Sequence, residues 1–260
     1  MTFHVVAHYI IDQGKELVEP FAVQDDVLST SQGTRFYVPA EYNNVYYVIA
    51  RGTLLWRVIL STPSLESRRR IWHVFPFERK SIFMDKDNPR FAKYFPPLSL
   101  TPTEELRYLV SLEPANSPAP TLILTVLGPE RVQKVTPENI EIRRFWFNLN
   151  IGQAYSWVSV TPNLDTPLAA GRYRLLGAVM SGDDLIAGRV IIYGQVWRPP
   201  VLVFPGSELE SLTVSPKVLE EFTFYPLGEF DHLHIPILQV MAPGIGSATV
   251  WGYFILERLR

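Results

Sequence analysis

Residues 106–127 read LRYLVSLEPANSPAPTLILTVL, two runs rich in apolar residues on either side of a turn that contains three prolines. Apolar, β-branched runs bounded by turn residues are typical of β-strands. Residues 233–256, LHIPILQVMAPGIGSATVWGYFIL, show the same order of strand, proline-containing turn and strand. The second stretch begins 127 positions after the first. The spacing therefore predicts that one structural unit occurs twice in the chain.

A tripeptide supports the same duplication. Residues 74–76, VFP, recur as residues 203–205, which is 129 positions later. Between the two copies, residues 128–137 are polar and contain prolines, and they are too few to form a free linker. We therefore place the domain boundary there and predict a first β-sandwich over residues 1–130 and a second over residues 131–260.

The rest of the chain has the same strand-like pattern, with turn residues between the strands. Helical pattern is scarce, since residues 103–106 and 216–221 are the stretches that favour one helical turn each. The predicted fold class is all-β, with two tandem jelly-roll-like antiparallel β-sandwiches related by internal duplication. Each sandwich is expected to have about eight strands.

Composition restricts the function. Hydrophobic residues make up 47% and charged residues 19% of the chain, against about 25% charged in ordinary globular domains. A large β core explains this balance, and so does an outer surface that meets other subunits. The net charge of −2 argues against a protein that coats nucleic acid.

The residue types also bear on the compartment. The chain has no cysteine, 22 prolines, and 18 arginines against 6 lysines. This fits a reducing compartment or a hot one, and we predict a thermophilic source. No stretch has the pattern of a signal peptide or of a membrane-spanning helix, so we expect no classical secretion and no membrane span.

Asp231-His232-Leu233-His234 is the strongest candidate for a metal site, with His232 and His234 as ligands. In a strand, both imidazoles point to one face. The spacing is similar to the His-x-His pair of the cupins, whose glutamate a few residues on and distant third histidine are missing here. We therefore predict no metal and no cofactor, and expect two half-exposed histidines at a strand end.

Other candidate motifs are better explained as turns. Asp183 and Asp184 form a carboxylate pair in a Ser-Gly-Asp-Asp sequence that is ordinary hairpin chemistry. Residues 244–248, GIGSA, lack the strand-to-helix context of a nucleophile elbow. No glycine loop ends in Lys-Ser or Lys-Thr. The sequence contains no convincing catalytic residues, and we predict that the protein is not an enzyme.

A basic cluster and the aromatic residues leave alternatives open. Arg68, Arg69 and Arg70 fit contact with a nucleic-acid backbone, pairing with acids of a neighbouring subunit, or a solvated loop. The six tryptophans lie mostly within predicted strands, where packing in a core or an interface is the usual role. Aromatic side chains aligned on one exposed face would instead indicate carbohydrate binding.

Duplicated sandwiches, a charge-poor composition and no catalytic constellation together resemble the double jelly-roll virion proteins of bacterial and archaeal viruses. The resemblance implies a capsid shell subunit, or a cement or spike component, located in the virion and made in the host cytoplasm. It also implies a homo-oligomer, expected to be trimeric, that binds other virion proteins. The terminal strands are the expected interface, with Phe3, Trp251, Tyr253 and Phe254 as candidate contacts.

Two other functions remain open on the sequence. One is a tandem carbohydrate-binding β-sandwich module or appendage, which requires exposed, coplanar aromatic rings. The other is a cupin-like metalloenzyme, which requires metal bound through His232 and His234.

Overall fold

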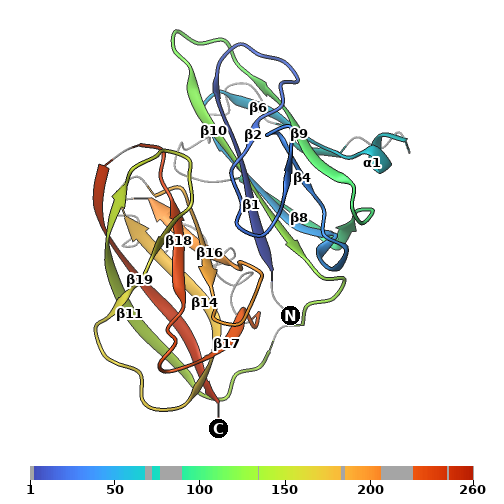
Figure 1. Cartoon of the computed structure of the whole chain (residues 1–260). Helices are drawn as coiled ribbons and strands as arrows, with labels where there is room; N and C mark the ends of the chain where they lie inside the picture. The colour runs from blue at the N-terminus through green and yellow to red at the C-terminus, as the bar shows by residue number, and fades with distance from the viewer. Residues whose placement is uncertain are drawn as a thin grey trace. The chain divides into compact units, whose positions relative to one another are not determined.

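The computed structural model describes residues 3–67, 72–76, 90–133, 135–182, 185–205, 225–244 and 246–259 (Figure 1). Strands dominate this part of the chain, and its helices are the 3-10 turn η1 (Ala40–Tyr42) and the five-residue α1 (Pro63–Ser67). The all-β prediction is confirmed. Contacts divide the chain into an N-terminal unit, Val5–Glu130, and a C-terminal unit that combines Arg131–Arg260 with Met1–His4.

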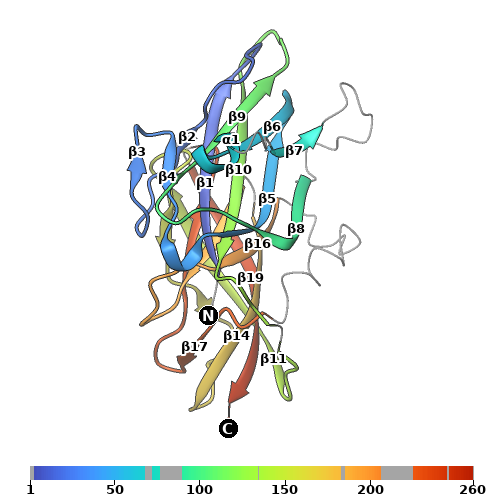
Figure 2. The ribbon, with the colours of Figure 1, turned by 90° about the vertical axis from the view of Figure 1, so that its right-hand side faces the viewer.

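The N-terminal unit is a sandwich of two five-stranded sheets, with orders β2-β1-β10-β5-β8 and β3-β4-β9-β6-β7 (Figures 1 and 2). If the two-residue strands β2 and β3 are left out, eight strands remain, and we number them 1 to 8 in chain order. The first sheet, β1-β10-β5-β8, then has the order 1-8-3-6, and the second, β4-β9-β6-β7, has the order 2-7-4-5. This order is that of a jelly roll. The strands are β1 (His4–Asp12), β2 (Phe21–Ala22), β3 (Thr30–Ser31), β4 (Arg35–Tyr37), β5 (Asn44–Gly52), β6 (Leu55–Ser61), β7 (Trp72–Pro76), β8 (Arg90–Ser99), β9 (Glu105–Leu112) and β10 (Ala119–Gly128).

The C-terminal unit has the same strand order. Leaving out the two-residue β13, its strands in chain order form 1-8-3-6 and 2-7-4-5 again, as β11-β19-β14-β17 and β12-β18-β15-β16. The strands are β11 (Ile140–Ile151), β12 (Val158–Val160), β13 (Asn163–Leu164), β14 (Arg172–Gly182), β15 (Ala187–Ile191), β16 (Pro200–Pro205), β17 (Gly228–Asp231), β18 (Ile237–Met241) and β19 (Gly246–Leu259). Two tandem jelly rolls therefore follow one another along the chain.

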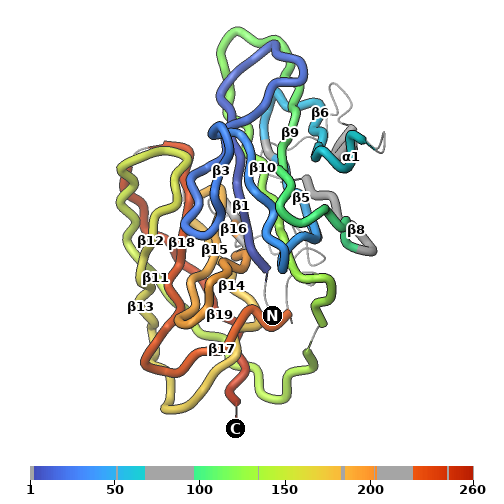
Figure 3. Tube along the Cα trace, turned by 45° about the vertical axis from the view of Figure 1, so that its right-hand side comes forward, coloured from blue at the N-terminus to red at the C-terminus, as the bar shows by residue number. Residues whose placement is uncertain are grey.

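The sheets of the C-terminal unit are joined at both sides. A parallel pairing of β14 with β16, from Val179↔Leu202 to Gly182↔Pro205, connects them on one side. On the other side β12 pairs with β18 and β13 pairs with β11, so one short stretch of chain serves both sheets (Figure 3). The strands thus form one continuous path from β12 to β13.

The sequence repeats fall at equivalent positions. Residues 74–76 end β7 and residues 203–205 end β16, and each is the fifth of the eight strands of its unit. Residues 106–127 contain β9 and β10, the last two strands of the first jelly roll. Residues 233–256 contain β18 and most of β19, although β18 begins at Ile237 rather than at Leu233.

Two local predictions were wrong. Residues 103–106, expected to make a helical turn, form a tight turn in which Thr103 has φ of 67° before β9 begins at Glu105. Residues 62–64, Thr-Pro-Ser, have a sequence that predicts a turn, but they lead into α1, where the Thr62 hydroxyl accepts from the Leu65 amide at 3.3 Å. Residues 216–221 lie outside the described residues.

Alternation along the strands builds each core. On β11, Phe145, Phe147, Leu149 and Ile151 are buried while the residues between them are half-buried or exposed. Since successive side chains point to opposite faces, this strand has one core face and one outer face. Phe145 lies opposite Gly252 of β19, and its ring packs on Phe254 with centroids 4.5 Å apart.

Gly252 is required by this packing. A Cβ atom there would overlap the Phe145 ring and the Val179 carbonyl oxygen, whereas nothing lies within 4 Å of a Cβ atom at Gly246 of the same strand. We expect Gly252→Ala to lower the free energy of unfolding by about 1–3 kcal/mol, because a backbone group cannot yield. Gly246→Ala should change it by less than about 0.5 kcal/mol. Urea unfolding measures both, and equal effects would contradict the packing described for β19.

Candidate functional site

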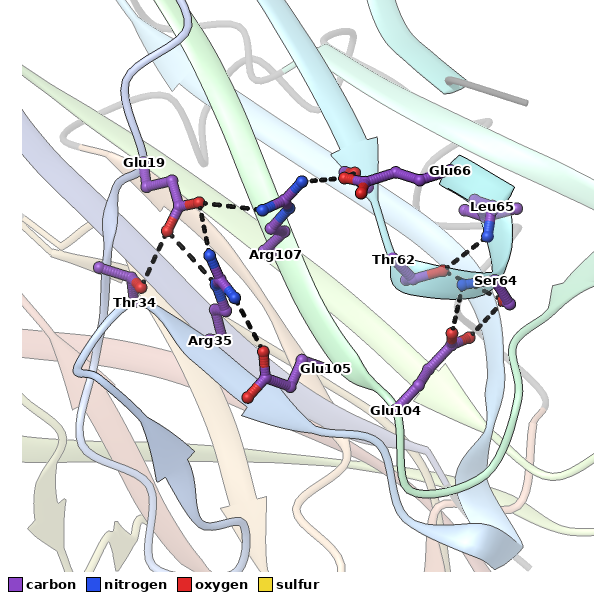
Figure 4. Close-up of polar contacts among 11 residues, drawn as sticks. Glu19, Thr34, Arg35, Thr62, Ser64, Leu65, Glu66, Glu104, Glu105 and Arg107 are labelled. Carbon is purple, nitrogen blue, oxygen red and sulfur yellow. Dashed lines mark hydrogen bonds and ion pairs between the residues drawn. The ribbon is translucent and has the colours of Figure 1, made fainter. Parts of the chain in front are cut away.

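Among the described residues, the most connected polar cluster is an ion-pair network on the N-terminal unit, formed by Glu19, Arg35, Glu66, Glu105 and Arg107 (Figure 4). Arg35 binds Glu19 through Nη2 at 3.0 Å and Glu105 through Nη1 at 2.9 Å. Arg107 Nη1 lies 3.3 Å from Glu19 Oε1, and Nη2 pairs with Glu66. The network therefore attaches Glu19, in the segment between β1 and β2, to β4 and β9.

Glu104, which is not part of the ion-pair network, anchors α1. Glu104 accepts from the Ser64 amide at 3.0 Å, from the Ser64 hydroxyl at 2.9 Å and from the Thr101 amide at 2.7 Å (Figure 4). An acidic acceptor at the first residues of a helix satisfies amides that have no partner within the helix. Glu104 thus connects α1 to the turn that precedes β9.

The network lowers the pKa of two of its carboxyls, Glu19 and Glu105. Burial works to raise the pKa of Glu19, but bonds from Arg35 and Thr34 and the charges of Arg35 and Arg107 outweigh it, so the pKa is lowered. The bond from Arg35 lowers the pKa of Glu105, and the bond from Glu19 raises the pKa of Arg35. General acid catalysis near neutral pH needs a carboxyl pKa shifted upward. The direction of these shifts fits a structural network.

The two candidate metal ligands, His232 and His234, occupy a turn. β17 ends at Asp231, whose Oδ1 accepts from the amides of Leu233 at 2.8 Å and His234 at 3.1 Å. The assumption that His232 and His234 share a strand face is therefore wrong. His232 Nδ1 accepts from the Gly171 amide at 3.3 Å, while His234 Nδ1 lies 2.7 Å from Asp231 Oδ2.

The two imidazoles thus have separate partners. The His234 ring also stacks on Tyr193, with centroids 4.6 Å apart. In the described part of the chain, no group of three or more histidine, cysteine, aspartate or glutamate side chains is arranged to hold a metal ion. The side chains at this turn stabilise the turn itself, as an aspartate at such a position commonly does.

Several sequence candidates lie elsewhere. Arg68, Arg69 and Arg70 fall outside the described residues, as do Asp183 and Asp184. Of the GIGSA stretch, Gly246 begins β19, so the serine at position 247 is the second residue of a strand. A strand start lacks the sharp turn into a helix that exposes a nucleophilic serine.

The outer side of β11 and β19 carries exposed apolar side chains. We call it the β11–β19 face, defined by Ile140, Ile142, Arg144, Trp146, Trp251, Tyr253 and Ile255. Ile142 is 65% exposed, Ile140 48%, Trp251 41% and Tyr253 38%. Contiguous exposed apolar side chains on a sheet are characteristic of a surface that binds another molecule.

Strand pairing makes this face rigid. β11 and β19 are in register over twelve consecutive pairs, from Ile140↔Glu257 to Ile151↔Gly246, with no bulge. Within this ladder Trp146 lies opposite Trp251, with ring centroids 6.2 Å apart. Cross-strand aromatic pairs stabilise a sheet and fix the position of its side chains. The face is therefore formed before any partner binds.

The charge on the face is compensated. The Arg144 guanidinium carbon lies 4.4 Å from the centroid of the Trp251 ring, and its Nε lies 3.6 Å from Asp165 Oδ2. A cation above an indole ring is attracted by the ring electrons, and the aspartate neutralises the remaining charge. Farther along the strands the face becomes polar, where Thr249 Oγ1 donates to Asn148 Oδ1 at 3.2 Å.

The predicted interface residues differ in exposure. Trp251 and Tyr253 lie on the β11–β19 face, whereas Phe3 and Phe254 are each 1% exposed and belong to the core of the C-terminal unit. Their role in an interface stays a prediction. Ile140 and Ile142 were not among the predicted interface residues, although the alternation in residues 140–149, IEIRRFWFNL, places them on one side of a strand.

The chain has few matches among known proteins. No family model and no curated protein matches it. Among solved structures three chains match, and one of them is the crystal structure of the major capsid protein P2 from bacteriophage PM2. That match covers 98% of each chain at 9% identity, with a TM-score of 0.25. In the described residues, no helix is long and apolar enough to cross a membrane.

The ion-pair network gives a prediction for stability. Arg35→Met removes two ion pairs whose side chains are about a quarter exposed, and we expect it to lower the free energy of unfolding by about 1 kcal/mol. Arg172→Met is the matched control, because Arg172 is 70% exposed and pairs with Glu229 alone among the described ion pairs. Its effect should be within about 0.5 kcal/mol.

The same variant should change the response to acid. Carboxyls with lowered pKa stabilise the fold above the ordinary value of 4.5, and this stability is lost as the pH falls. Arg35→Met should therefore lose less stability than the original protein between pH 5 and pH 3, measured by denaturant unfolding at each pH. Identical acid profiles would show that the network does not hold these carboxyls ionised.

Proposed function

We propose that the protein is a structural virion protein, a capsid shell subunit or a cement or spike component, that assembles with copies of itself. The β11–β19 face carries this proposal. It is rigid, its charge is compensated, and its apolar side chains are exposed on a sheet whose other face is already packed. Such a face suits contact with another protein better than contact with a small reactant, which binds in concave sites.

The energetics of the face favour association. Burying apolar surface contributes about 25 cal/mol per Å², and aromatic and arginine side chains dominate the energy of many interfaces. Trp146, Trp251 and Tyr253 provide the aromatic contacts and Arg144 the guanidinium. Because strand pairing already orders these side chains, little conformational entropy is lost when a partner covers them.

The assembled form follows from the same surface. In an oligomer with closed symmetry, one contact is repeated around a ring, so modest contacts give a stable assembly. We propose that the protein forms a trimer. This trimer would also bind other virion proteins. Phe3 and Phe254 would support the interface from within the core. This role places the protein in the virion after synthesis in the host cytoplasm, and it needs no catalytic residues.

Contact with nucleic acid would add to the same role. The arginines at 68–70 are the candidates for it, because guanidinium groups pair with phosphates. With a net charge of −2 for the chain, such a contact would be local and would serve to attach nucleic acid to an inner wall.

Carbohydrate binding is the second candidate. Its support is that Trp146, Trp251 and Tyr253 share one exposed face, next to the amide of Asn148 and the hydroxyl of Thr249. However, the Trp146 and Trp251 rings are tilted by 43°, and Arg144 already covers part of Trp251. A flat stacking platform for sugar rings is therefore not formed, which favours the protein partner. The cupin-like metalloenzyme has no comparable support, because His232 and His234 have separate partners.

Assembly gives a direct test. At micromolar concentration the protein should form oligomers, seen as a mass of several chains in solution and as regular particles by electron microscopy. The paired substitution Ile142→Asp and Tyr253→Asp introduces charge into the β11–β19 face and should weaken self-association by at least about 100-fold. Thr249→Asp adds a charge at the polar end of the same strand and should change it by less than about fivefold.

Two outcomes would contradict the proposal. A stable monomer at micromolar concentration would argue against a shell role. Equal weakening by Thr249→Asp would show that the substitutions act through charge in general and not through the apolar contact. Glycan-array binding that is lost in the paired variant, with a monomeric original protein, would favour carbohydrate recognition instead.

A further inference from the structure

The C-terminal unit has an open pocket where the ends of three neighbouring strands meet. β11 and β14 begin there and β19, which lies between them, ends there. The pocket is lined by residues 139–141, Ala170, Gly171, Arg258 and Leu259, and its volume is about 690 Å³. Pockets that bind small molecules have volumes of about 300–1,000 Å³. This pocket is therefore large enough for an organic ligand.

Arg258 lies on the core side of β19. Every second residue of this strand from Val250 to Leu256 is buried, and Arg258 continues that row. On β11, Glu141 lies in the row that contains the buried Phe145. The side of the sheet that forms the apolar core thus ends in charged residues, and these residues line the pocket.

The position of the Arg258 guanidinium is fixed by the backbone before β14. Its Nη2 donates to the Ala170 carbonyl at 2.8 Å. A Cβ atom at Gly171 would lie 3.4 Å from Arg258 Nε, so the guanidinium lies directly beside the glycine backbone. The same segment is held in place because the Tyr173 hydroxyl donates to the Ala169 carbonyl at 2.9 Å. The guanidinium is therefore ordered before any ligand binds.

The charge of Arg258 differs from that of its neighbours in having no carboxylate beside it. On the strands that meet here, Arg143, Arg172 and Arg174 each pair with a glutamate, and no ion pair within the described part of the chain includes Arg258. A guanidinium carries several N–H donors. The described bonds of Arg258 use one of them, to Ala170. Donors and positive charge are therefore left for a ligand.

The acidic residues close to Arg258 are already engaged. Glu141 accepts from Arg143 Nε at 3.2 Å and also pairs with its Nη2. Glu257 points to the other face of β19, where Arg174 Nη1 lies 2.8 Å from its carboxylate. Among the charged residues that line the pocket, Glu141 is thus compensated and Arg258 is not, so the pocket favours an anion.

We propose that this pocket binds an organic monocarboxylate with an apolar body. The planar guanidinium matches the geometry of a carboxylate, and the Asn139 amide is a further donor in the lining. Ile140, Ala170 and Leu259 give the lining its apolar part. A phosphate fits less well, because its larger charge would meet a single guanidinium beside the Glu141 carboxylate. This binding is separate from the proposed assembly and adds a ligand to the function.

NMR titration of the methyl-labelled full chain tests the proposal. The probe is hexanoate, and hexanamide is its neutral match. Hexanoate should shift the methyl signals of Ile140, Ala170 and Leu259 until they saturate. Hexanamide should bind at least about tenfold more weakly, because it cannot form a charged pair with the guanidinium.

A matched pair of variants locates the site. Arg258→Gln keeps a donor for the Ala170 carbonyl but removes the charge, and should weaken hexanoate binding at least about tenfold. Arg172→Gln is the control, because Arg172 lies on the neighbouring strand outside the lining and is 70% exposed. It should change the affinity by less than about twofold.

The source of the carboxylate is tested with the blocked peptide acetyl-Leu-Glu-Leu-amide. Tighter binding of the peptide than of hexanoate supports the proposal with an acidic side chain of another chain as the ligand. Tighter binding of hexanoate supports it with a free acid as the ligand.

Several results would overturn the proposal. They are the absence of saturable shifts, shifts confined to residues away from the pocket, equal binding of hexanoate and hexanamide, and tighter binding of inorganic phosphate. Unchanged affinity in Arg258→Gln would overturn it as well. If that variant does not fold, the two probes on the original protein give the answer. A monomeric protein that binds hexanoate would contradict the assembly role and support this site, so the two proposals fail separately.

Discussion

Pairing of the first strand with the last is the interaction on which each unit depends. β1 pairs with β10, and β11 pairs with β19 over twelve residues, although more than 90 positions separate their residues in the sequence. Neither pair can form until the chain between them has come together, and the entropy of closing such a loop opposes it. Domains dominated by such non-local pairs fold slowly. The β11–β19 face therefore depends on the same long-range pairing that closes its sheet.

In each unit an arginine joins two glutamates. The N-terminal unit uses its arginines and glutamates in an outward ion-pair network that attaches a connecting segment to β4 and β9. On the C-terminal unit, Arg174 similarly joins Glu229 to Glu257, at 3.0 and 2.8 Å. With these charges engaged, the β11–β19 face is left to apolar and aromatic side chains. These ion pairs lie within each unit, and the β11–β19 face carries one charged side chain among its defining residues, Arg144, which pairs with Asp165.

The sequence predicted the fold class and the duplication but not the order of the strands in the sheets. Alternation and turn residues indicated an all-β fold, and the repeated VFP tripeptide marked the fifth strand of each jelly roll. The turn at Asp231 was missed, because two local amides that donate to the Asp231 carboxylate override a strand-like pattern. Ile140 and Ile142 were missed as surface residues, since an apolar residue at alternate positions reads equally as core until the pairing of the strand shows which face is covered. Cross-strand neighbours such as Arg144 and Trp251 depend on register, which the sequence does not specify.

The continuous strand path of the C-terminal unit has a consequence for how this protein avoids fibre formation. Unpaired rims of sheets recruit strands from other chains and lead to amyloid-like growth. Here the path begins at β12 and ends at β13, which are edge strands of three and two residues. The β14–β16 pairing joins the two sheets on the other side, so the paired parts of β14 and β16 are not free edges. These two ends of the path therefore offer little unpaired strand backbone to which a strand of another chain could add. If copies of the chain associate as proposed, this unit would favour contact through side chains over the addition of backbone strands.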